Sequence, residues 1–207
     1  MPKTNKKSLK KLRILVSISD KEGIVSFINN LKKLYSLEII ATFGTAKYLK
    51  EAGIEVIVVE KVTGFPQLFD GRIKMIHLPI FAPILADQQN KKHLKQLKKL
   101  KVEPYDMVVV NLYPFSENVK KKLTLKEMIE NIDIGGPAAV RAAAKNFQSI
   151  IAVCDPKDYL KVLKLLKKQG DLNFTQRKNL AKKVFKMTFN HDRDIIKYLS
   201  IVKGASW

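Results

Sequence analysis

The clearest buried strand in the chain is the apolar run DMVVVNL at residues 106–112, which the pair Tyr113-Pro114 ends. A short, continuous apolar run of this kind is typical of a strand that is covered on both faces of a sheet. Outward from this run, further strands are predicted at 13–19, 38–43, 54–59 and 149–153. Segments with helical patterns separate these strands, which predicts an α/β fold around a mostly parallel central sheet.

Helix signals stand between the strands. The forms Ser-x-x-Glu at 19–22 and Thr-x-x-Glu at 124–127 match the capping box, in which two side chains bond free N–H groups of a first turn. Thr45 is expected to cap a helix over 46–52. The segment 73–86 is left undecided between helix and loop, because its two prolines would interrupt a helix.

Length and composition fit one globular domain. The 207 residues are 46% hydrophobic and 28% charged, and we predict a flexible basic arm over 1–12 and one domain over 13–207. No apolar run approaches the ~18 residues of a transmembrane helix, so no membrane association is expected. A single cysteine, Cys154, and three widely spaced histidines argue against a metal centre. A reducing, cytoplasmic setting is expected.

The formal net charge of +20 raises the hypothesis of an RNA-binding protein. Most of the excess is lysine, whereas base readout and bidentate phosphate contacts favour arginine. In the segment 91–101, leucines fall near one helical face and lysines cover the other. We therefore interpret the lysines mainly as solvated faces. RNA binding stays the weaker alternative, because the lysine runs lack interleaved aromatic residues.

Two loops at the carboxyl ends of predicted strands have the features of phosphate sites, and ligand sites in such folds lie at that edge of the sheet. SISDK at 17–21 combines two hydroxyls, a lysine and a helix start. TFGTA at 42–46 has a Gly-Thr turn that opens a helix. A plain helix cap and an ordinary turn are the alternatives. The chain has no Walker sequence and no Gly-x-Gly-x-x-Gly, which disfavours triphosphate and dinucleotide ligands.

Two further segments carry groups for acid–base chemistry. Arg72 and Lys74 form a cationic pair in a glycine-containing loop, which either binds an anion or is a solvated loop. Asp133 precedes Gly135-Gly136 at a helix start, where backbone N–H groups can stabilise an oxyanion. Lys145 ends an alanine-rich helix. It is expected to be buried with Asp133 as its partner, or else to interact with the helix dipole.

Read together, these segments resemble one family. NLYPF at 111–115, ENIDIGGP at 130–137 and RAAAKN at 141–146 are similar to the signature of the IMP cyclohydrolase domain of the bifunctional purine-biosynthesis proteins. Those proteins also carry an AICAR transformylase domain. Further matches, in the same order along the chain, are SISDKEG at 17–23, GTA at 44–46, TGFP at 63–66 and DGRIK at 70–74. The resemblance runs from about residue 13 to 199.

The resemblance implies a three-layer, methylglyoxal-synthase-like α/β fold without a metal or organic cofactor. It also implies a reaction, the ring closure of 5-formamido-imidazole-4-carboxamide ribotide (FAICAR) to IMP with loss of water. By position, the catalytic candidates are Lys74, Tyr113, Asp133 and Lys145, with Asp133 and Lys145 moving protons and the other two orienting and polarising. The candidates for ribotide and phosphate binding are Ser17, Ser19, Lys21, Gly44, Thr45, Arg72, Asn111, Gly135 and Gly136.

The chain departs from the family pattern in three places. Met75 stands where the family usually has threonine, Phe43 stands where it has glycine, and Leu78 and Pro83 alter the segment after His77. These changes favour, as the main alternative, a ribotide-binding relative that has lost catalysis. A methylglyoxal synthase is a further alternative, which the segments at 111–115 and 131–136 disfavour.

The resemblance also bears on partners. The expected partner is a small-molecule ribotide, and nucleic acid is not expected. The family commonly dimerises, which leaves a homodimer open for this chain. No transformylase domain is expected within the 207 residues, which leaves open both a free-standing cyclohydrolase and an excised domain. If the chain is free-standing, a separate AICAR-formylating enzyme would supply the substrate.

Overall fold

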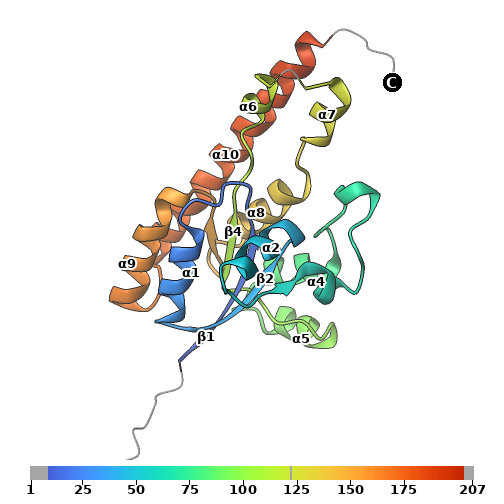
Figure 1. Ribbon diagram of the computed structural model, residues 1–207. Helices are drawn as coiled ribbons and strands as arrows, with labels where there is room; N and C mark the ends of the chain where they lie inside the picture. The colour runs from blue at the N-terminus through green and yellow to red at the C-terminus, as the bar shows by residue number, and fades with distance from the viewer. Residues whose placement is uncertain (1–8, 122, 203–207) are drawn as a thin grey trace, which may run out of the picture.

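The computed structural model describes residues 9–121 and 123–202 and forms an α/β fold around one parallel sheet (Figure 1). The sheet has five strands in the order β3-β2-β1-β4-β5, and every pair is parallel. The strands are β1 (Lys11–Ser17), β2 (Ser36–Ala41), β3 (Ile57–Val58), β4 (Met107–Val110) and β5 (Ile151–Val153). The predicted fold class is confirmed.

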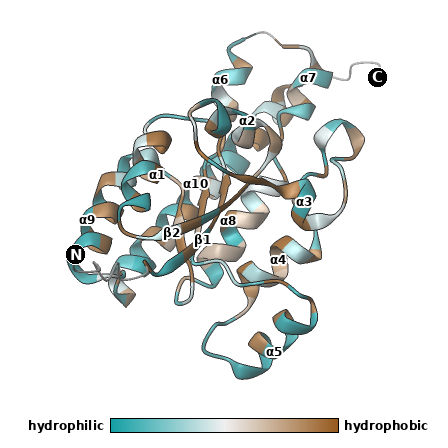
Figure 2. Ribbon diagram, turned by 60° about the horizontal axis from the view of Figure 1, so that its bottom comes forward, coloured by the Kyte–Doolittle hydropathy of each residue, from teal (hydrophilic) through white to brown (hydrophobic). Residues whose placement is uncertain are grey.

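Helices cover both faces of the sheet and give the three layers. Figure 2 shows apolar strands at the centre, with α1 and α9 on one side and α4 and α8 on the other. The helices are α1 (Ile24–Lys32), α2 (Phe43–Glu51), α3 (Val59–Thr63), α4 (Leu78–Leu85), α5 (Lys91–Lys99), α6 (Phe115–Val119), α7 (Leu125–Glu130), α8 (Gly135–Lys145), α9 (Tyr159–Gln169) and α10 (Phe174–Ile201). The described residues also form two 3₁₀ turns, η1 (Phe69–Gly71) and η2 (Pro156–Asp158). None of these helices is long and apolar enough to cross a membrane.

The central strand supplies both cores. Ile14 and Val16 of β1 pack into the cluster under α1 and α9, whereas Leu15 packs into the cluster under α4 and α8. Successive side chains of a strand point to opposite faces, so a continuous apolar run is what a doubly covered strand requires. This is why the short apolar runs of the sequence predict the strands.

The sheet has a topological switch point between β1 and β4. From β1 the chain passes outward to β2 and β3, and it then returns to the other side of β1 as β4. Val16 pairs with Val109 and Ser17 with Val110, so the loops after β1 and β4 leave the sheet side by side. Ligand sites in open α/β sheets lie in the crevice beyond such a point.

The local predictions at helix starts have mixed outcomes. The capping box at Thr124 is confirmed, since its hydroxyl accepts from the Glu127 N–H and the Glu127 carboxylate accepts from the Thr124 N–H. The box at Ser19 is wrong, because α1 begins at Ile24 behind a left-handed Gly23 (φ 67°). Thr45 is inside α2 and not at its cap, and its hydroxyl accepts from the N–H of Ile18 at 3.0 Å.

Three predicted boundaries also change. The strand expected at 54–59 is reduced to β3, because Val59 already begins α3. The undecided segment forms α4, with Pro79 in the first turn, where no N–H is needed, and with Pro83 buried inside the helix. Lys11 and Leu12 belong to β1 and not to an arm, and residues 1–8 lie outside the described residues.

Candidate active site

The Asn111 side chain joins the loops after β1 and β4 at the switch point. Its Oδ1 accepts from the N–H groups of Ser19 and Asp20 at 2.7 and 2.9 Å, and its Nδ2 donates to the Asp20 carbonyl at 2.7 Å. Asn111 itself is buried. These bonds take the amide oxygen and one of the two Nδ2 hydrogens, so Asn111 shapes the loop that carries Ser17, Ser19 and Lys21.

A group of hydroxyls joins the ends of β1 and β2. The Thr42 hydroxyl donates to Ser17 Oγ at 3.2 Å and lies 3.3 Å from the buried Thr45 hydroxyl. Beside them α2 begins, with Thr42 as its N-cap and no side chain bonded to its first N–H groups. The Cβ position of Gly44 has no heavy atom within 4 Å, so this helix start is open. An open helix N-terminus flanked by hydroxyls suits a phosphate.

The start of α8 holds Asp133 in one orientation. Asp133 Oδ1 accepts from the Gly136 N–H at 2.9 Å, and a Cβ at Gly136 would collide with Asp133 Oδ2. A side chain at 136 would therefore displace this carboxylate. Pro137 carries no N–H, and the N–H of Gly135 has no hydrogen-bond partner among the described residues. The predicted pair of oxyanion donors at Gly135-Gly136 thus reduces to one.

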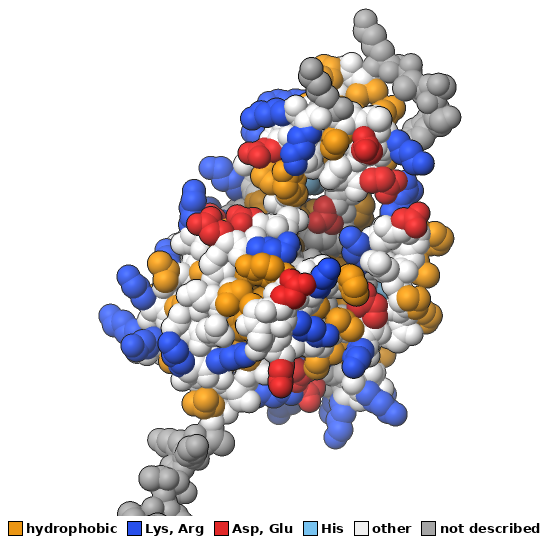
Figure 3. All heavy atoms as spheres, in the orientation of Figure 1, with side chains coloured by type: hydrophobic (Ala, Val, Ile, Leu, Met, Phe, Trp, Pro, Cys, Tyr) orange, Lys and Arg blue, Asp and Glu red, His pale blue; other side chains and the backbone are white. Residues whose placement is uncertain are grey.

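The segments that carry three candidate residues lie around that turn. Leu112 Cδ2 lies 3.0 Å from the Cβ position of Gly136, and Met75 Cγ lies 3.4 Å from that of Gly135. Tyr113 follows Leu112 directly, Lys74 precedes Met75, and Asp133 bonds the same turn. The structure therefore brings the segments of Lys74, Tyr113 and Asp133 together at the carboxyl edge of the sheet. Figure 3 shows the surface hollowed on this side, with charged side chains around the hollow.

A strained loop presents Lys74. Leu68 and Ile73 form an antiparallel bridge, and between them Phe69, Asp70 and Gly71 have φ values of 54°, 53° and 90°. The Lys74 side chain folds back over Gly71, with its Cε 2.7 Å from the Cβ position of that glycine. Consecutive left-handed residues are costly for side chains other than glycine, and such strain concentrates at functional sites.

Arg72 is engaged by a neighbouring helix. Its Nη2 lies 2.5 Å from Glu130 Oε1 at the end of α7, and its Nε donates to Glu130 Oε2. The Arg72 hydrogen bond holds the pKa of Glu130 below its usual range. The predicted ligand-binding residue is therefore part of an exposed ion pair that ties the loop of Lys74 to α7.

Tyr113 also has a partner that sequence reasoning missed. Lys121 Nζ donates to Tyr113 Oη at 2.7 Å and lies 4.8 Å from the centre of the Tyr113 ring. The two residues flank the short α6, eight positions apart. The turn through α6 brings them together, and no helix or strand periodicity in the sequence indicated that.

The predicted pair of Asp133 and Lys145 is wrong. α8 runs from Gly135 to Lys145, and eleven helical residues span about 16 Å. Asp133 lies at the carboxyl edge of the sheet, whereas Lys145 lies at the opposite edge, beside Asn146, which bonds the end of α4. Lys145 is also exposed and not buried. The alanines of α8 face the core, but the helix ends at the surface.

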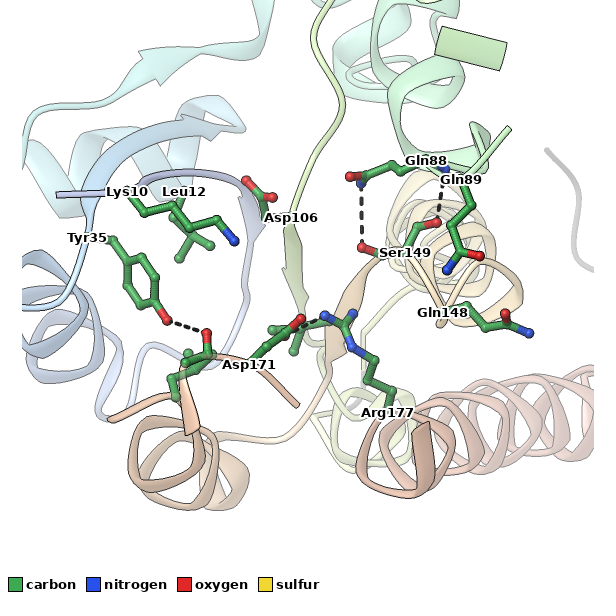
Figure 4. A pocket seen from close by; sticks show the side chains of 13 residues that line it. Lys10, Leu12, Tyr35, Gln88, Gln89, Asp106, Gln148, Ser149, Asp171 and Arg177 are labelled. Atoms are coloured by element: carbon green, nitrogen blue, oxygen red, sulfur yellow. Dashed lines mark hydrogen bonds and ion pairs between the residues drawn. The ribbon is translucent and has the colours of Figure 1, made fainter. Parts of the chain in front are cut away.

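A cavity of about 220 Å³ opens at that opposite edge and not at the candidate site (Figure 4). Apart from Lys10, its charged side chains are already bonded. Arg177 pairs with Asp171 at 2.6 Å, and Asp106 accepts the Arg13 N–H at 2.7 Å. The Tyr35 hydroxyl donates to the Gly170 carbonyl. These contacts hold strand and helix ends together, so we assign the cavity no ligand.

Two residues singled out by the sequence have structural roles. Met75 is 2% exposed and packs in the core beside α8, so the side chain in place of threonine fills space. Cys154 is also buried, and burial raises the pKa of its thiol to about 12, which leaves it protonated and unreactive. Within the described residues, no three His, Cys, Asp or Glu side chains are grouped to hold a metal ion.

Comparison with known proteins identifies the family. Residues 23–138 match the family described as the MGS-like domain, and residues 143–206 match the AICARFT/IMPCHase bienzyme. The chain is 48% identical over 188 residues to the bifunctional purine biosynthesis protein PurH of Acetivibrio thermocellus and 45% identical over 193 residues to that of Bacillus subtilis. These matches cover 90% and 93% of this chain but only 36% and 38% of the relatives, so the chain spans little more than a third of their length.

A solved structure agrees with this result. The crystal structure of ForH superposes with a TM-score of 0.74 at 30% identity, covering 89% of this chain and 96% of ForH. Fold and sequence thus define the class, and the chain belongs to the MGS-like domain family. Within it, the chain matches the IMP cyclohydrolase domain of PurH, as the resemblance predicted.

Proposed function

We propose that the chain is an IMP cyclohydrolase, which closes the ring of FAICAR to IMP with loss of water. The observation that carries the proposal is the meeting of three segments at the turn before α8. The segments that carry a carboxylate, a phenol and an ammonium group come to one edge of the sheet there, and the open start of α2, which suits a phosphate, lies at the same edge. The match of the chain to the cyclohydrolase domain of the PurH relatives supports the same reaction.

The reaction requires proton transfer more than a strong nucleophile. The carboxamide nitrogen attacks the formyl carbon, a carbon–nitrogen bond forms, and the formyl oxygen becomes an oxyanion. Asp133, held by the Gly136 N–H, accepts the proton that the nitrogen loses. The Tyr113 hydroxyl and the Lys74 ammonium donate to the oxyanion, which takes up one proton to become a hydroxyl and a second proton to leave as water. The formamido nitrogen loses its proton as the ring double bond forms.

The other end of the ribotide needs a phosphate site. The start of α2 offers open N–H groups at Gly44 and its neighbours, next to Ser17 and the loop that carries Ser19 and Lys21. A helix N-terminus binds a phosphate through its N–H groups and its dipole. Ser17, Ser19, Lys21, Gly44 and Thr45 are therefore proposed for this end, with Thr45 acting through the loop that its hydroxyl bonds.

The test follows the absorbance of purified protein with FAICAR against an enzyme-free control. Formation of IMP at a rate proportional to protein concentration is the expected result. No turnover, while IMP still raises the melting temperature, would support a ribotide-binding relative without catalysis. That second function is favoured by one observation, the bulky Phe43 that stands 59% exposed at the open start of α2. If the protein showed neither turnover of FAICAR nor binding of the ribotide, both functions would be contradicted.

A further inference from the structure

We propose that Lys121 is a positioning residue, which directs the hydroxyl hydrogen of Tyr113 toward the substrate and strengthens it as a donor. The inference rests on the proposed cyclohydrolase function, in which Tyr113 donates to the formyl oxygen. It adds a residue that does not belong to any of the family motifs quoted above.

The contact between the two side chains is close and has a defined direction. Lys121 Nζ lies 2.7 Å from Tyr113 Oη and also sits near the ring face, 4.8 Å from its centre. An ammonium group has three donors and no acceptor, so the tyrosine oxygen must accept this bond. The hydroxyl hydrogen then points away from Lys121. Accepting a bond from a charged donor also polarises the O–H and makes it a stronger donor.

The backbone that carries both residues is anchored. Tyr113 precedes α6 and Lys121 follows it, so α6 sets their separation. Phe115, at the start of α6, is 1% exposed and meets the rings of His191 and Tyr198 of α10 at centroid distances of 6.2 and 5.6 Å. Asn118 bonds Asn131 at 3.0 Å, beyond the end of α7. The Lys121–Tyr113 contact is thus placed by packing on α10, although both side chains are partly in solvent.

Lys120 provides a matched control. It is also exposed, it adjoins Lys121, and it forms no ion pair or side-chain hydrogen bond with any described residue. Its removal takes away the same charge from the same surface without touching Tyr113. A general electrostatic effect of the lysines would therefore appear equally in Lys120→Met and Lys121→Met.

The experiment measures kcat and KM for FAICAR in the wild type and in the single variants Lys121→Met, Lys121→Arg, Lys120→Met and Tyr113→Phe. It also measures them in the double variant that combines Tyr113→Phe with Lys121→Met. Lys121→Met is expected to lower kcat about 5- to 30-fold with KM nearly unchanged, since one charged hydrogen bond is lost. Lys121→Arg should recover most of that loss. The double variant should be no slower than Tyr113→Phe, because Lys121 acts only through that hydroxyl.

Three results would overturn the proposal. Equal kcat values for Lys121→Met and Lys120→Met would leave Lys121 no special role. Multiplicative losses in the double variant would show that Lys121 acts elsewhere than on Tyr113. A melting temperature lowered in step with kcat would make the residue structural. An inactive wild type is a different outcome, since it contradicts the cyclohydrolase function on which the proposal rests.

Discussion

At the scale of single residues, the candidate site depends on side chains that orient other groups. Asn111 binds the loop after β1, and Gly136 gives Asp133 both its hydrogen bond and the space for its carboxylate. The family resemblance predicted both positions as ligand-binding, and the sequence also indicated Gly136 as a backbone donor at a helix start. It could not separate ligand contacts from supporting contacts, since that depends on which atoms are already bonded.

Gly136→Ala is the sharpest single substitution at this scale. The new Cβ would collide with the Asp133 carboxylate, so we expect turnover of FAICAR to fall about 10- to 100-fold, as displacement of a reacting group by ~1 Å does. Urea unfolding should show a loss of about 1–3 kcal/mol, the cost typical of overpacking. In an Asp133→Ala background the same substitution should cost much less stability. An equal cost in both backgrounds would place the collision elsewhere.

At the scale of elements, α6 and α7 support the site from outside the sheet. Lys121 after α6 bonds Tyr113, and Glu130 at the end of α7 pairs with Arg72 in the loop of Lys74. The sequence predicted α7 from its capping box but not α6, which has five residues and no helical period to detect. It also missed both supporting contacts, because they depend on how these short helices fold back on the sheet.

Glu130→Gln tests the support of the Lys74 loop. The substitution keeps the shape of the side chain and removes the charge that holds Arg72, so the strained loop should become less ordered. We expect KM for FAICAR to rise about two- to five-fold, a modest effect because the pair is exposed to solvent. Glu117→Gln, at an exposed position of α6, is the control and should leave KM unchanged. Equal KM values for the two variants would rule out the support.

The ion pair of Arg72 and Glu130 also predicts how the effect of Glu130→Gln on KM changes with pH. Because Arg72 lowers the pKa of Glu130 in the folded protein, the pair is intact above the ordinary glutamate pKa of about 4.3 and is lost as pH falls through the lowered value. The difference in KM between wild type and Glu130→Gln should therefore be constant near neutral pH and shrink in acid. A difference that grew in acid would contradict the pairing.

At the scale of the whole molecule, the sequence predicted the layers and the edge of the sheet that carries the site. It could do so because doubly covered strands need continuous apolar runs and because parallel strands share one carboxyl edge. It misplaced Lys145, since an alanine-rich neighbourhood indicates burial of the helix face but not where the helix ends. The 11-residue length of α8 takes Lys145 to the far edge.

The net charge of +20 has a consequence at this scale too. A cationic protein attracts a phosphorylated substrate over long distances, and dissolved salt screens that attraction. We expect kcat/KM for FAICAR to fall about 3- to 10-fold between 20 mM and ~300 mM salt, while kcat changes little. Stopped-flow or steady-state rates at constant pH would measure it. A kcat/KM that does not vary with salt would mean that the lysines form only solvated surfaces and do not attract the substrate.

The most direct test of the site at the carboxyl edge compares Asp133→Asn with Lys145→Ala in the FAICAR cyclisation assay. The two residues stand at opposite ends of α8. The comparison therefore distinguishes a site at the edge of the sheet where Tyr113 lies from a site at the edge where the cavity opens. Asp133→Asn should lower kcat about 100-fold or more, as loss of a general base does, and Lys145→Ala should stay within about three-fold of the wild type. A loss in Lys145→Ala as large as that in Asp133→Asn would contradict a site formed within one chain at the carboxyl edge.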